Sequence, residues 1–120
     1  MKEVIYARGT IVVKIGGSTL GGNDTTLDGL ALLQKRGFKC VVVHGGGKII
    51  TKWMSKQGLR PRFVRGLRVT DKPSLNIAVA VLAGLVNKNL VASLSDNGCQ
   101  VVGVTGVDGC ILQARLKDPK

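Results

Sequence analysis

The fold is decided by Thr10-Ile-Val-Val-Lys14-Ile-Gly16-Gly17-Ser18 and, after a helical segment, by Lys39-Cys-Val-Val-Val43-His44-Gly45-Gly46-Gly47. Both runs are apolar and rich in β-branched residues without alternation, which is typical of parallel strands buried on both faces. Between them, residues 26–36 have the length and the apolar periodicity of a crossover helix, which Gly37 ends. The pattern therefore predicts a βαβ unit.

Each of the two predicted strands ends in a glycine loop. The crossover between parallel strands is almost always right-handed, so the carboxyl ends of both strands lie at the same edge of the sheet. Open α/β sheets bind ligands at this edge, where glycines let backbone N–H groups approach an oxyanion. The second loop also leads directly into a helix from about Lys48, and Lys14 lies at the end of the first strand. Because a helix start favours an anion, the pattern predicts a cradle for a phosphate or a carboxylate.

Taken singly, each glycine loop is typical of an ordinary turn, and only their shared position at one sheet edge indicates a site. Neither loop has the Gly-x-Gly-x-x-Gly spacing of dinucleotide-binding proteins or the Walker signature of P-loop enzymes. Those two nucleotide-binding classes are therefore disfavoured.

The composition indicates one α/β domain rather than a disordered or membrane-spanning chain. The sequence has 120 residues, of which 44% are hydrophobic and 3% aromatic, so we expect a modest aliphatic core. We find no apolar run as long as a membrane span and no signal peptide, which predicts a cytoplasmic location. The three cysteines have no metal-ligand spacing and the chain has one histidine, so no metal site is expected.

The formal net charge of +11 is concentrated in one part of the chain. No acidic residue occurs between Asp28 and Asp71, a run that contains Lys35, Arg36, Lys39, Lys48, Lys52, Lys56, Arg60, Arg62, Arg65 and Arg68. This charge favours an acidic small molecule, an acidic protein or nucleic acid, and a solvated basic face without a partner is an equal alternative. Aromatic residues that could stack on bases are sparse, so nucleic acid is disfavoured.

Residues 48–57 read as a helix that Gly58 closes, and residues 59–71 read as a hairpin or lid around Gly66 that reaches over the glycine loops. Arginine suits bidentate binding of a carboxylate or a phosphate. Arg65 and Arg68 compete for that role, and both could equally be surface charges on a loop.

A long helix is predicted from about Pro73 to Asn97. Its first part, through Asn87, carries no charge, and its apolar residues surround the helix axis. A helix that is apolar all round must be covered on all sides, and we favour a subunit interface over a central position in so small a domain. After Gly98, residues 99–104 read as a strand, Asp108-Gly109 as a tight turn, and residues 110–116 as a half-exposed strand. Residues 4–6 offer a further strand start.

These residues resemble the N-terminal part of the amino acid kinase family, and within it the acetylglutamate kinase branch. The matching pieces occur in the family's order over nearly the whole chain. They are residues 13–18, His44-Gly45-Gly46-Gly47, Gly66-Leu67-Arg68-Val69-Thr70-Asp71, Asn87-Lys88 and Gly106-Val107-Asp108-Gly109. The resemblance implies an α/β fold, with a mainly parallel sheet flanked by helices, in which residues 1–120 form the N-terminal lobe of an αβα sandwich.

The resemblance implies transfer of the γ-phosphoryl group of ATP, with Mg²⁺, to the side-chain carboxylate of N-acetyl-L-glutamate in arginine biosynthesis. By motif, Lys14 is similar to the catalytic lysine that stabilises the transferring phosphoryl group. Arg68, rather than Arg65, is similar to the clamp on the α-carboxylate of the substrate. The backbone donors to the substrate and the phosphoryl group would come from Gly16, Gly17, Gly45, Gly46 and Gly47. The family's long helix also pairs subunits, which implies a homodimer through residues 73–97.

Members of the acetylglutamate kinase branch are considerably longer, and their C-terminal half carries most of the nucleotide site. The resemblance thus implies an acceptor-substrate lobe that is apparently truncated, and we expect the 120-residue chain alone to be inactive. One alternative is the sister kinase that acts on aminoadipate or glutamate held by a small acidic carrier protein, which the basic run would suit. Another is a non-catalytic piece that binds anions through its basic surface or only dimerises.

Overall fold

The computed structural model describes residues 9–16 and 25–115. The possible strand at residues 4–6 and the predicted donor Gly17 lie outside the described residues. The elements in chain order are β1 (Thr10–Ile15), α1 (Thr26–Lys35), β2 (Lys39–His44), α2 (Gly47–Lys56), β3 (Phe63–Val64), β4 (Leu67–Arg68), α3 (Lys72–Val79), the π-helical segment η1 (Ala80–Val86), α4 (Asn87–Asp96) and the 3-10 turn η2 (Asp108–Cys110).

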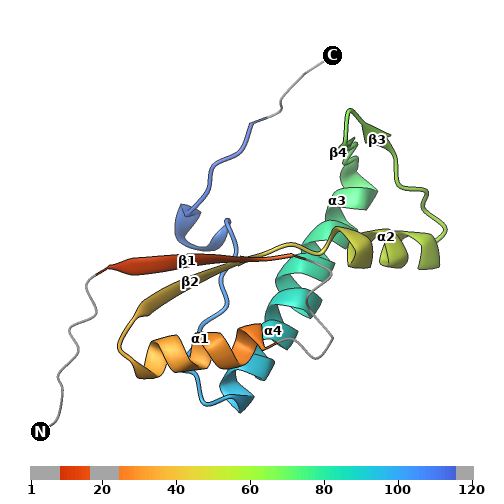
Figure 1. The fold of residues 1–120 in the computed structure, drawn as a ribbon. Helices are drawn as coiled ribbons and strands as arrows, with labels where there is room; N and C mark the ends of the chain where they lie inside the picture. The colour runs from red at the N-terminus through yellow and green to blue at the C-terminus, as the bar shows by residue number, and fades with distance from the viewer. Residues whose placement is uncertain (1–8, 17–24, 116–120) are drawn as a thin grey trace, which may run out of the picture.

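The predicted βαβ unit is confirmed. Strands β1 and β2 pair in parallel, in a register that joins Thr10 to Lys39 and Ile15 to His44. Helices α1 and α4 lie along one side of this pair (Figure 1), and Ile15, Leu30, Leu90 and Leu94 form a buried cluster there. The expectation that the strands are buried on both faces is wrong for the described residues, because their apolar side chains alternate. Those on the opposite face, Val12, Val41 and Val43, are exposed.

The predicted long helix runs without a break through α3, η1 and α4, from Lys72 to Asp96. It begins where the Asp71 carboxylate accepts a hydrogen bond from the Ser74 N–H at 3.0 Å, which caps the first turn. A second buried cluster joins it to α2 and contains Ile50, Met54, Ile77, Val81 and Val86. Leu75 and Val79 remain about half exposed on its other side. The helix therefore connects two separate small cores.

By length and composition alone, this helix could cross a membrane. It has 25 residues, and the mean hydropathy of its apolar 18-residue window is 1.8. The expectation that no apolar run reaches the length of a membrane span is therefore wrong, because the charge of Lys88, which every 18-residue window of this helix contains, leaves the mean hydropathy high. One third of that window is buried inside the structure, and the core helix of a globular domain passes the same test.

The hairpin predicted around Gly66 is confirmed. Phe63 pairs with Arg68 and Val64 with Leu67, so Arg65 and Gly66 form a two-residue turn. Both turn residues have positive φ, 48° and 78° respectively. This combination is the one that a tight hairpin of right-handed twist requires, and Gly66 adopts it without strain.

The two strands predicted after the long helix are wrong for the described residues, because residues 99–107 and 111–115 have no strand partner. Residues 99–104 are instead held by side chains. The Gln34 side-chain amide bonds the backbone of Gln100 twice, donating to its carbonyl at 2.8 Å and accepting from its N–H at 2.9 Å. The turn predicted at Asp108-Gly109 is present as η2. There the Asp108 carboxylate accepts from the N–H and the hydroxyl of Thr105.

Candidate functional site

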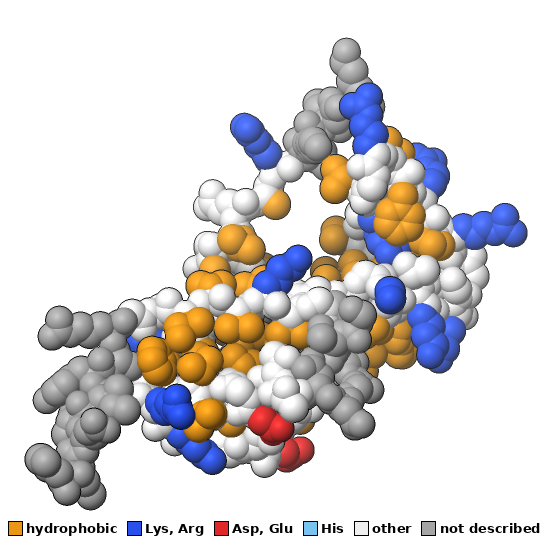
Figure 2. Space-filling model, viewed as in Figure 1, with side chains coloured by type: hydrophobic (Ala, Val, Ile, Leu, Met, Phe, Trp, Pro, Cys, Tyr) orange, Lys and Arg blue, Asp and Glu red, His pale blue; other side chains and the backbone are white. Residues whose placement is uncertain are grey.

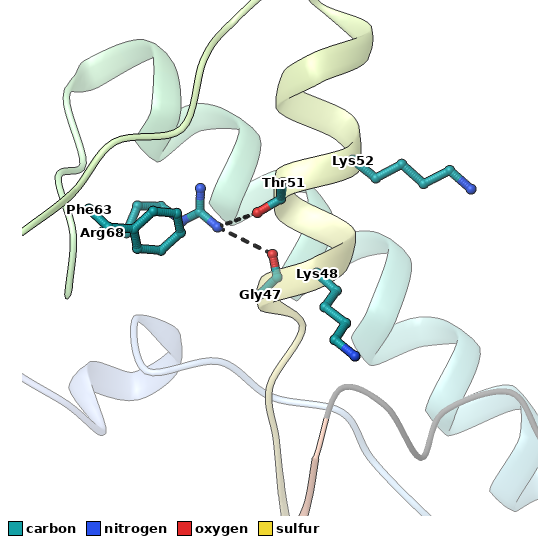
Figure 3. A pocket seen from close by; sticks show the side chains of 6 residues that line it. All are labelled: Gly47, Lys48, Thr51, Lys52, Phe63 and Arg68. Atoms are coloured by element: carbon teal, nitrogen blue, oxygen red, sulfur yellow. Dashed lines mark hydrogen bonds between the residues drawn. The ribbon is translucent and has the colours of Figure 1, made fainter. Parts of the chain in front are cut away.

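An open pocket of about 460 Å³ lies between the first turns of α2 and the β3–β4 hairpin. Gly47, Thr51 and Phe63 line it together with three cationic residues, Lys48, Lys52 and Arg68. Figure 3 shows that the Arg68 side chain reaches across from the hairpin to α2. The Lys48 and Lys52 side chains extend from α2 away from Arg68. All the charged side chains that line the pocket are therefore positive.

The Arg68 guanidinium is held in place by four contacts. Its Nη2 donates to the Thr51 hydroxyl at 2.8 Å and to the Gly47 carbonyl at 3.2 Å. Its Nη1 lies 3.1 Å from the Met54 sulfur, and its central carbon lies 4.7 Å from the centre of the Phe63 ring. A guanidinium has five N–H donors, so a group fixed in this way can still present donors to a carboxylate or a phosphate.

The described starts of the two glycine loops lie side by side, as the βαβ prediction requires. Gly16 follows β1 directly, and the Gly45 N–H donates to the Ile15 carbonyl at 3.4 Å. Gly46 is buried against the long helix, where an added Cβ would lie 2.7 Å from Leu82 Cδ2. A larger residue there would have to push aside the end of the Leu82 side chain, so the glycine lets the loop backbone pack closely against η1.

Lys14 is exposed on β1 opposite Val43 of β2, and it does not line the pocket. The structure therefore brings two of the predicted site residues, Gly47 and Arg68, into one pocket. Gly16, Gly45 and Gly46, the other predicted backbone donors that the structure describes, lie where β1 and β2 end, next to this pocket. Arg65, the alternative to Arg68 for binding a carboxylate or a phosphate, lies exposed at the hairpin turn.

Sequence reasoning missed four residues that line the pocket, namely Lys48, Thr51, Lys52 and Phe63. Lys48 and Lys52 were expected only as part of the basic run between Asp28 and Asp71, and Thr51 carried no expectation. Thr51 lies four residues after Gly47, so helical spacing could have placed both on one face of α2. Phe63 could have been found from the hairpin, because a two-residue turn at Arg65-Gly66 pairs it directly with Arg68.

The electrostatics around the pocket favour an anion. Figure 2 shows Lys and Arg side chains gathered at the end of the molecule that carries α2 and the hairpin. The sequence has one acidic residue between Asp28 and Asp96, namely Asp71. The hydrogen bonds from Ser74 hold the pKa of Asp71 below its usual value, so this carboxylate stays ionised as the cap of α3.

The same surroundings do not suit a metal ion. The described residues contain no group of three or more His, Cys, Asp or Glu side chains that could hold one. Mg²⁺ prefers carboxylate, carbonyl and water oxygens, and the charged groups of this pocket are cations. The described part of the chain can therefore position an acidic organic molecule, but it offers Mg²⁺ no ligand set.

Comparison with known proteins gives a consistent result. The model of the amino acid kinase family matches residues 9–119. An acetylglutamate kinase of Dehalococcoides mccartyi (strain ATCC BAA-2266 / KCTC 15142 / 195) is 46% identical over 107 residues, which cover 89% of this chain and 39% of the relative. An acetylglutamate kinase of Archaeoglobus fulgidus is 44% identical over 112 residues, which cover 91% of this chain and 39% of that relative. The chain spans about two fifths of the length of these curated relatives.

Solved structures agree with the fold class. A protein of Streptococcus mutans UA159 superposes with a TM-score of 0.70 at 36% identity, covering 76% of this chain and 38% of the other. The N-acetylglutamate synthase of Neisseria gonorrhoeae, solved in complex with coenzyme A and N-acetyl-glutamate, superposes with a TM-score of 0.59 at 35% identity. That match covers 78% of this chain and 22% of the synthase. The prediction of an α/β fold is thus confirmed, and the described residues contain a parallel strand pair together with helices.

Proposed function

This chain belongs to the amino acid kinase family, and from that membership we propose that residues 1–120 form the acceptor-substrate lobe of an acetylglutamate kinase. The proposed reaction transfers the γ-phosphoryl group of ATP to the side-chain carboxylate of N-acetyl-L-glutamate, a step of arginine biosynthesis. A carboxylate oxygen of the acceptor attacks the γ-phosphorus, and ADP leaves with the bridging oxygen.

The observation that carries the proposal is the position of Arg68 beside Gly47. Its guanidinium is fixed against α2 in a pocket whose charged residues are all cations. N-acetyl-L-glutamate has two carboxylates, and a planar guanidinium can bind one of them through two parallel hydrogen bonds. The name of the curated relatives and the N-acetyl-glutamate bound to the Neisseria gonorrhoeae synthase support this choice of ligand.

In this proposal, Arg68 binds the α-carboxylate and leaves the side chain of the substrate to the glycine loops. Gly46 and Gly47, with Gly16 and Gly17, supply backbone N–H groups to the reacting carboxylate and the phosphoryl group. Lys14 stabilises the negative charge that gathers on the transferring group. Phosphoryl transfer needs little covalent help from the protein, so positioning and fixed positive charge account for the role of this lobe.

ATP and Mg²⁺ would supply the phosphoryl group and the charge neutralisation of its oxygens. Since the described residues offer Mg²⁺ no ligand set, and most of the family's nucleotide site lies in the C-terminal half, we assign neither to this chain. We therefore expect the purified 120-residue chain to bind the acceptor without turning it over. ATP-dependent phosphorylation of N-acetyl-L-glutamate by this chain alone would contradict that expectation.

We also propose that the protein acts in the cytoplasm as a homodimer that pairs through residues 73–97. The half-exposed Leu75 and Val79 on the outer side of the long helix support this interface, because a second copy would bury them. Sedimentation of the chain over a range of concentrations tests it. A monomer at all concentrations would contradict the proposed pairing.

A second candidate acceptor is aminoadipate or glutamate carried by a small acidic protein. The basic surface around the pocket favours it, since Lys48, Lys52 and Lys56 and the nearby hairpin arginines could steer an acidic carrier. The free acetylated substrate remains our first choice because the curated relatives that cover this chain are acetylglutamate kinases.

The test is a calorimetric titration of the folded chain with N-acetyl-L-glutamate and, separately, with L-glutamate. We expect selective binding that falls roughly 10- to 100-fold in Arg68→Ala, because a hydrogen bond to a charged group contributes about 1.5–3 kcal/mol. Arg65→Ala is the matched control and should bind like the parent chain. Equal losses of affinity in both variants would indicate general charge attraction. Absence of binding by a folded parent chain would contradict the proposal.

A further inference from the structure

A short chain of polar contacts joins the long helix to the second glycine loop. Asn87, the first residue of α4, is 6% exposed, and its Nδ2 lies 3.2 Å from Nε2 of His44 at the end of β2. The other ring nitrogen, Nδ1, lies 3.2 Å from the carbonyl oxygen of Gly45. The contacts therefore run in series from the helix, through the imidazole, to the backbone of the loop.

The chemistry of the partners fixes the direction of both hydrogen bonds. A carbonyl oxygen only accepts, so Nδ1 of His44 must carry the proton that it donates to Gly45. In a neutral imidazole Nε2 is then an acceptor, and the Asn87 amide supplies the donor that it needs. The network selects the Nδ1–H tautomer of the neutral ring.

Holding the Gly45 carbonyl also orients the next N–H. The carbonyl of Gly45 and the N–H of Gly46 belong to one planar trans peptide, so they point to opposite sides of it. With the carbonyl turned toward His44, the Gly46 N–H points away from the ring. Within the described residues that N–H has no hydrogen-bond acceptor, which leaves it available to a ligand.

The helix is shaped to make this contact. The π-helical segment η1 ends at Val86, directly before Asn87, and both residues are buried. A π-helical turn rotates the residues that follow it relative to an α-helix, and such turns are frequent at functional sites. Leu82 and Val86 pack behind Gly46 while Asn87 reaches His44, so one stretch of helix supports the loop from two directions.

The far side of the Asn87 amide is close-packed. Its Oδ1 is buried without a hydrogen-bond partner, and Gly103 packs so closely that a Cβ there would collide with it. Lys88 donates to the Gly103 carbonyl at 3.0 Å, which holds the same segment from the next residue. Burying the Asn87 amide with its Oδ1 unpaired costs free energy. The hydrogen bond from its Nδ2 to His44 is the interaction that explains why an asparagine stands at this buried position.

We propose that Asn87 is a positioning residue for the glycine loop. Acting through His44, it holds the peptide between Gly45 and Gly46 so that the Gly46 N–H is a fixed donor to the anionic acceptor. The identity of that acceptor rests on the function proposed above, whereas the network itself does not. The two parts can therefore be tested separately.

The network is tested by nitrogen-15 NMR of the imidazole, which is unambiguous because the chain has one histidine. At mildly alkaline pH we expect a protonated Nδ1 and an unprotonated Nε2 in the parent chain. Asn87→Ala should release the ring to the Nε2–H form that solvent favours, and it should shift the Gly46 amide signal. Asn87→Asp, whose carboxylate only accepts, should place a proton on Nε2, and it keeps the test informative if Asn87→Ala does not fold. The exposed Asn89 gives the matched control, Asn89→Ala, which should leave both signals unchanged.

The same samples are then titrated with N-acetyl-L-glutamate. We expect Asn87→Ala to weaken binding about three- to tenfold, as loss of one neutral hydrogen bond does. A parent ring in the Nε2–H form, or a tautomer that does not change in Asn87→Ala, would overturn the inference whether or not the substrate binds. If the tautomer and the Gly46 signal respond as expected but the parent chain binds no N-acetyl-L-glutamate, the positioning network is supported and the proposed function fails.

Discussion

Residues 39–44 and 99–104 are similar in sequence but differ in structure. Each is a short apolar run that follows a helix ended by a glycine, Gly37 or Gly98. The first run is β2, which pairs with β1 over its whole length. The second run has no strand partner among the described residues, and the side chains of Gln34 and Lys88 bind its backbone.

The difference shows that an extended backbone and a strand have separate causes. β-branched residues favour the extended conformation locally, whereas a strand also needs a neighbour that pairs with its N–H and carbonyl groups. In the second run, Gly103 lets the chain approach α4 so closely that Asn87 and Val91 pack against it. The helix, rather than a sheet edge, therefore holds this run.

The largest expected effect on the free energy of unfolding comes from shortening a core side chain of the paired strand β1. Ile15 of β1 is 3% exposed, and Ile15→Ala should lower the free energy of unfolding by about 2–5 kcal/mol. Val101 packs only partly buried against the same cluster, so Val101→Ala should cost about 1 kcal/mol. Urea denaturation followed by circular dichroism measures both. Equal losses would mean that the unpaired run is as firmly packed as β1.

Gly103→Ala tests the close approach of the second run to the helix. The new methyl group would meet the Asn87 amide and Val91, so we expect a loss of about 1–3 kcal/mol in the free energy of unfolding. Gly84→Ala is the matched control, because a Cβ on that helical glycine meets open space and should stabilise the protein by about 0.5–1 kcal/mol. The same sign for both substitutions would contradict the account.

The Gln34 side chain is expected to matter locally. Gln34→Ala removes both hydrogen bonds to Gln100, and since they are exposed we expect a loss of about 0.5–1.5 kcal/mol. Amide hydrogen exchange should become faster at Gln100 and stay unchanged in β2. Gln57→Ala, at an exposed position on the end of α2, serves as the control. Unchanged exchange at Gln100 would mean that contacts with α4 alone hold the run.

The smallest expected effect is a pH dependence of the turn that follows the second run. Hydrogen bonds from the backbone and the side chain of Thr105 lower the pKa of Asp108 from its ordinary value of 3.8. Because the pKa of Asp108 is lower in the folded protein, the ionised carboxylate stabilises the folded turn at pH values above 3.8. This stabilisation is lost as the pH falls through the lower pKa of the folded protein. The Thr105 amide signal should therefore move on acidification below about pH 3.8. A Thr105 amide that shifts at the same pH in Asp108→Ala would contradict this assignment.

The sequence predicted the elements whose causes are local. Alternating helix and strand patterns gave the βαβ unit, the Pro73 start and uncharged run gave the long helix, and Gly66 gave the hairpin. The strands predicted at residues 99–104 and 110–116 could not be settled from sequence, because pairing depends on what lies beside them. The expectation of burial on both faces of β1 and β2 failed for the same reason.

The candidate site was predictable to a similar degree. Glycine loops at the ends of parallel strands indicated an anion site, and Gly47 and Arg68 lie in one cationic pocket. The supporting residues were not predictable from their own neighbours. Phe63 meets Arg68 only because the hairpin turn has two residues, and Asn87 meets His44 only because a π-helical turn precedes it. The roles of Lys14 and the glycines stay predictions.

The most direct test of the account is to map N-acetyl-L-glutamate on the nitrogen-15-labelled chain by its effect on backbone amide signals. The proposed acceptor site predicts shifts at Gly16, at the loop of residues 45–47, and at Thr51 and Arg68. It also predicts that the signals of the exposed lysines outside the pocket, such as Lys35 and Lys56, stay in place. Shifts that follow the basic surface as a whole would contradict an acceptor site and would favour general anion binding.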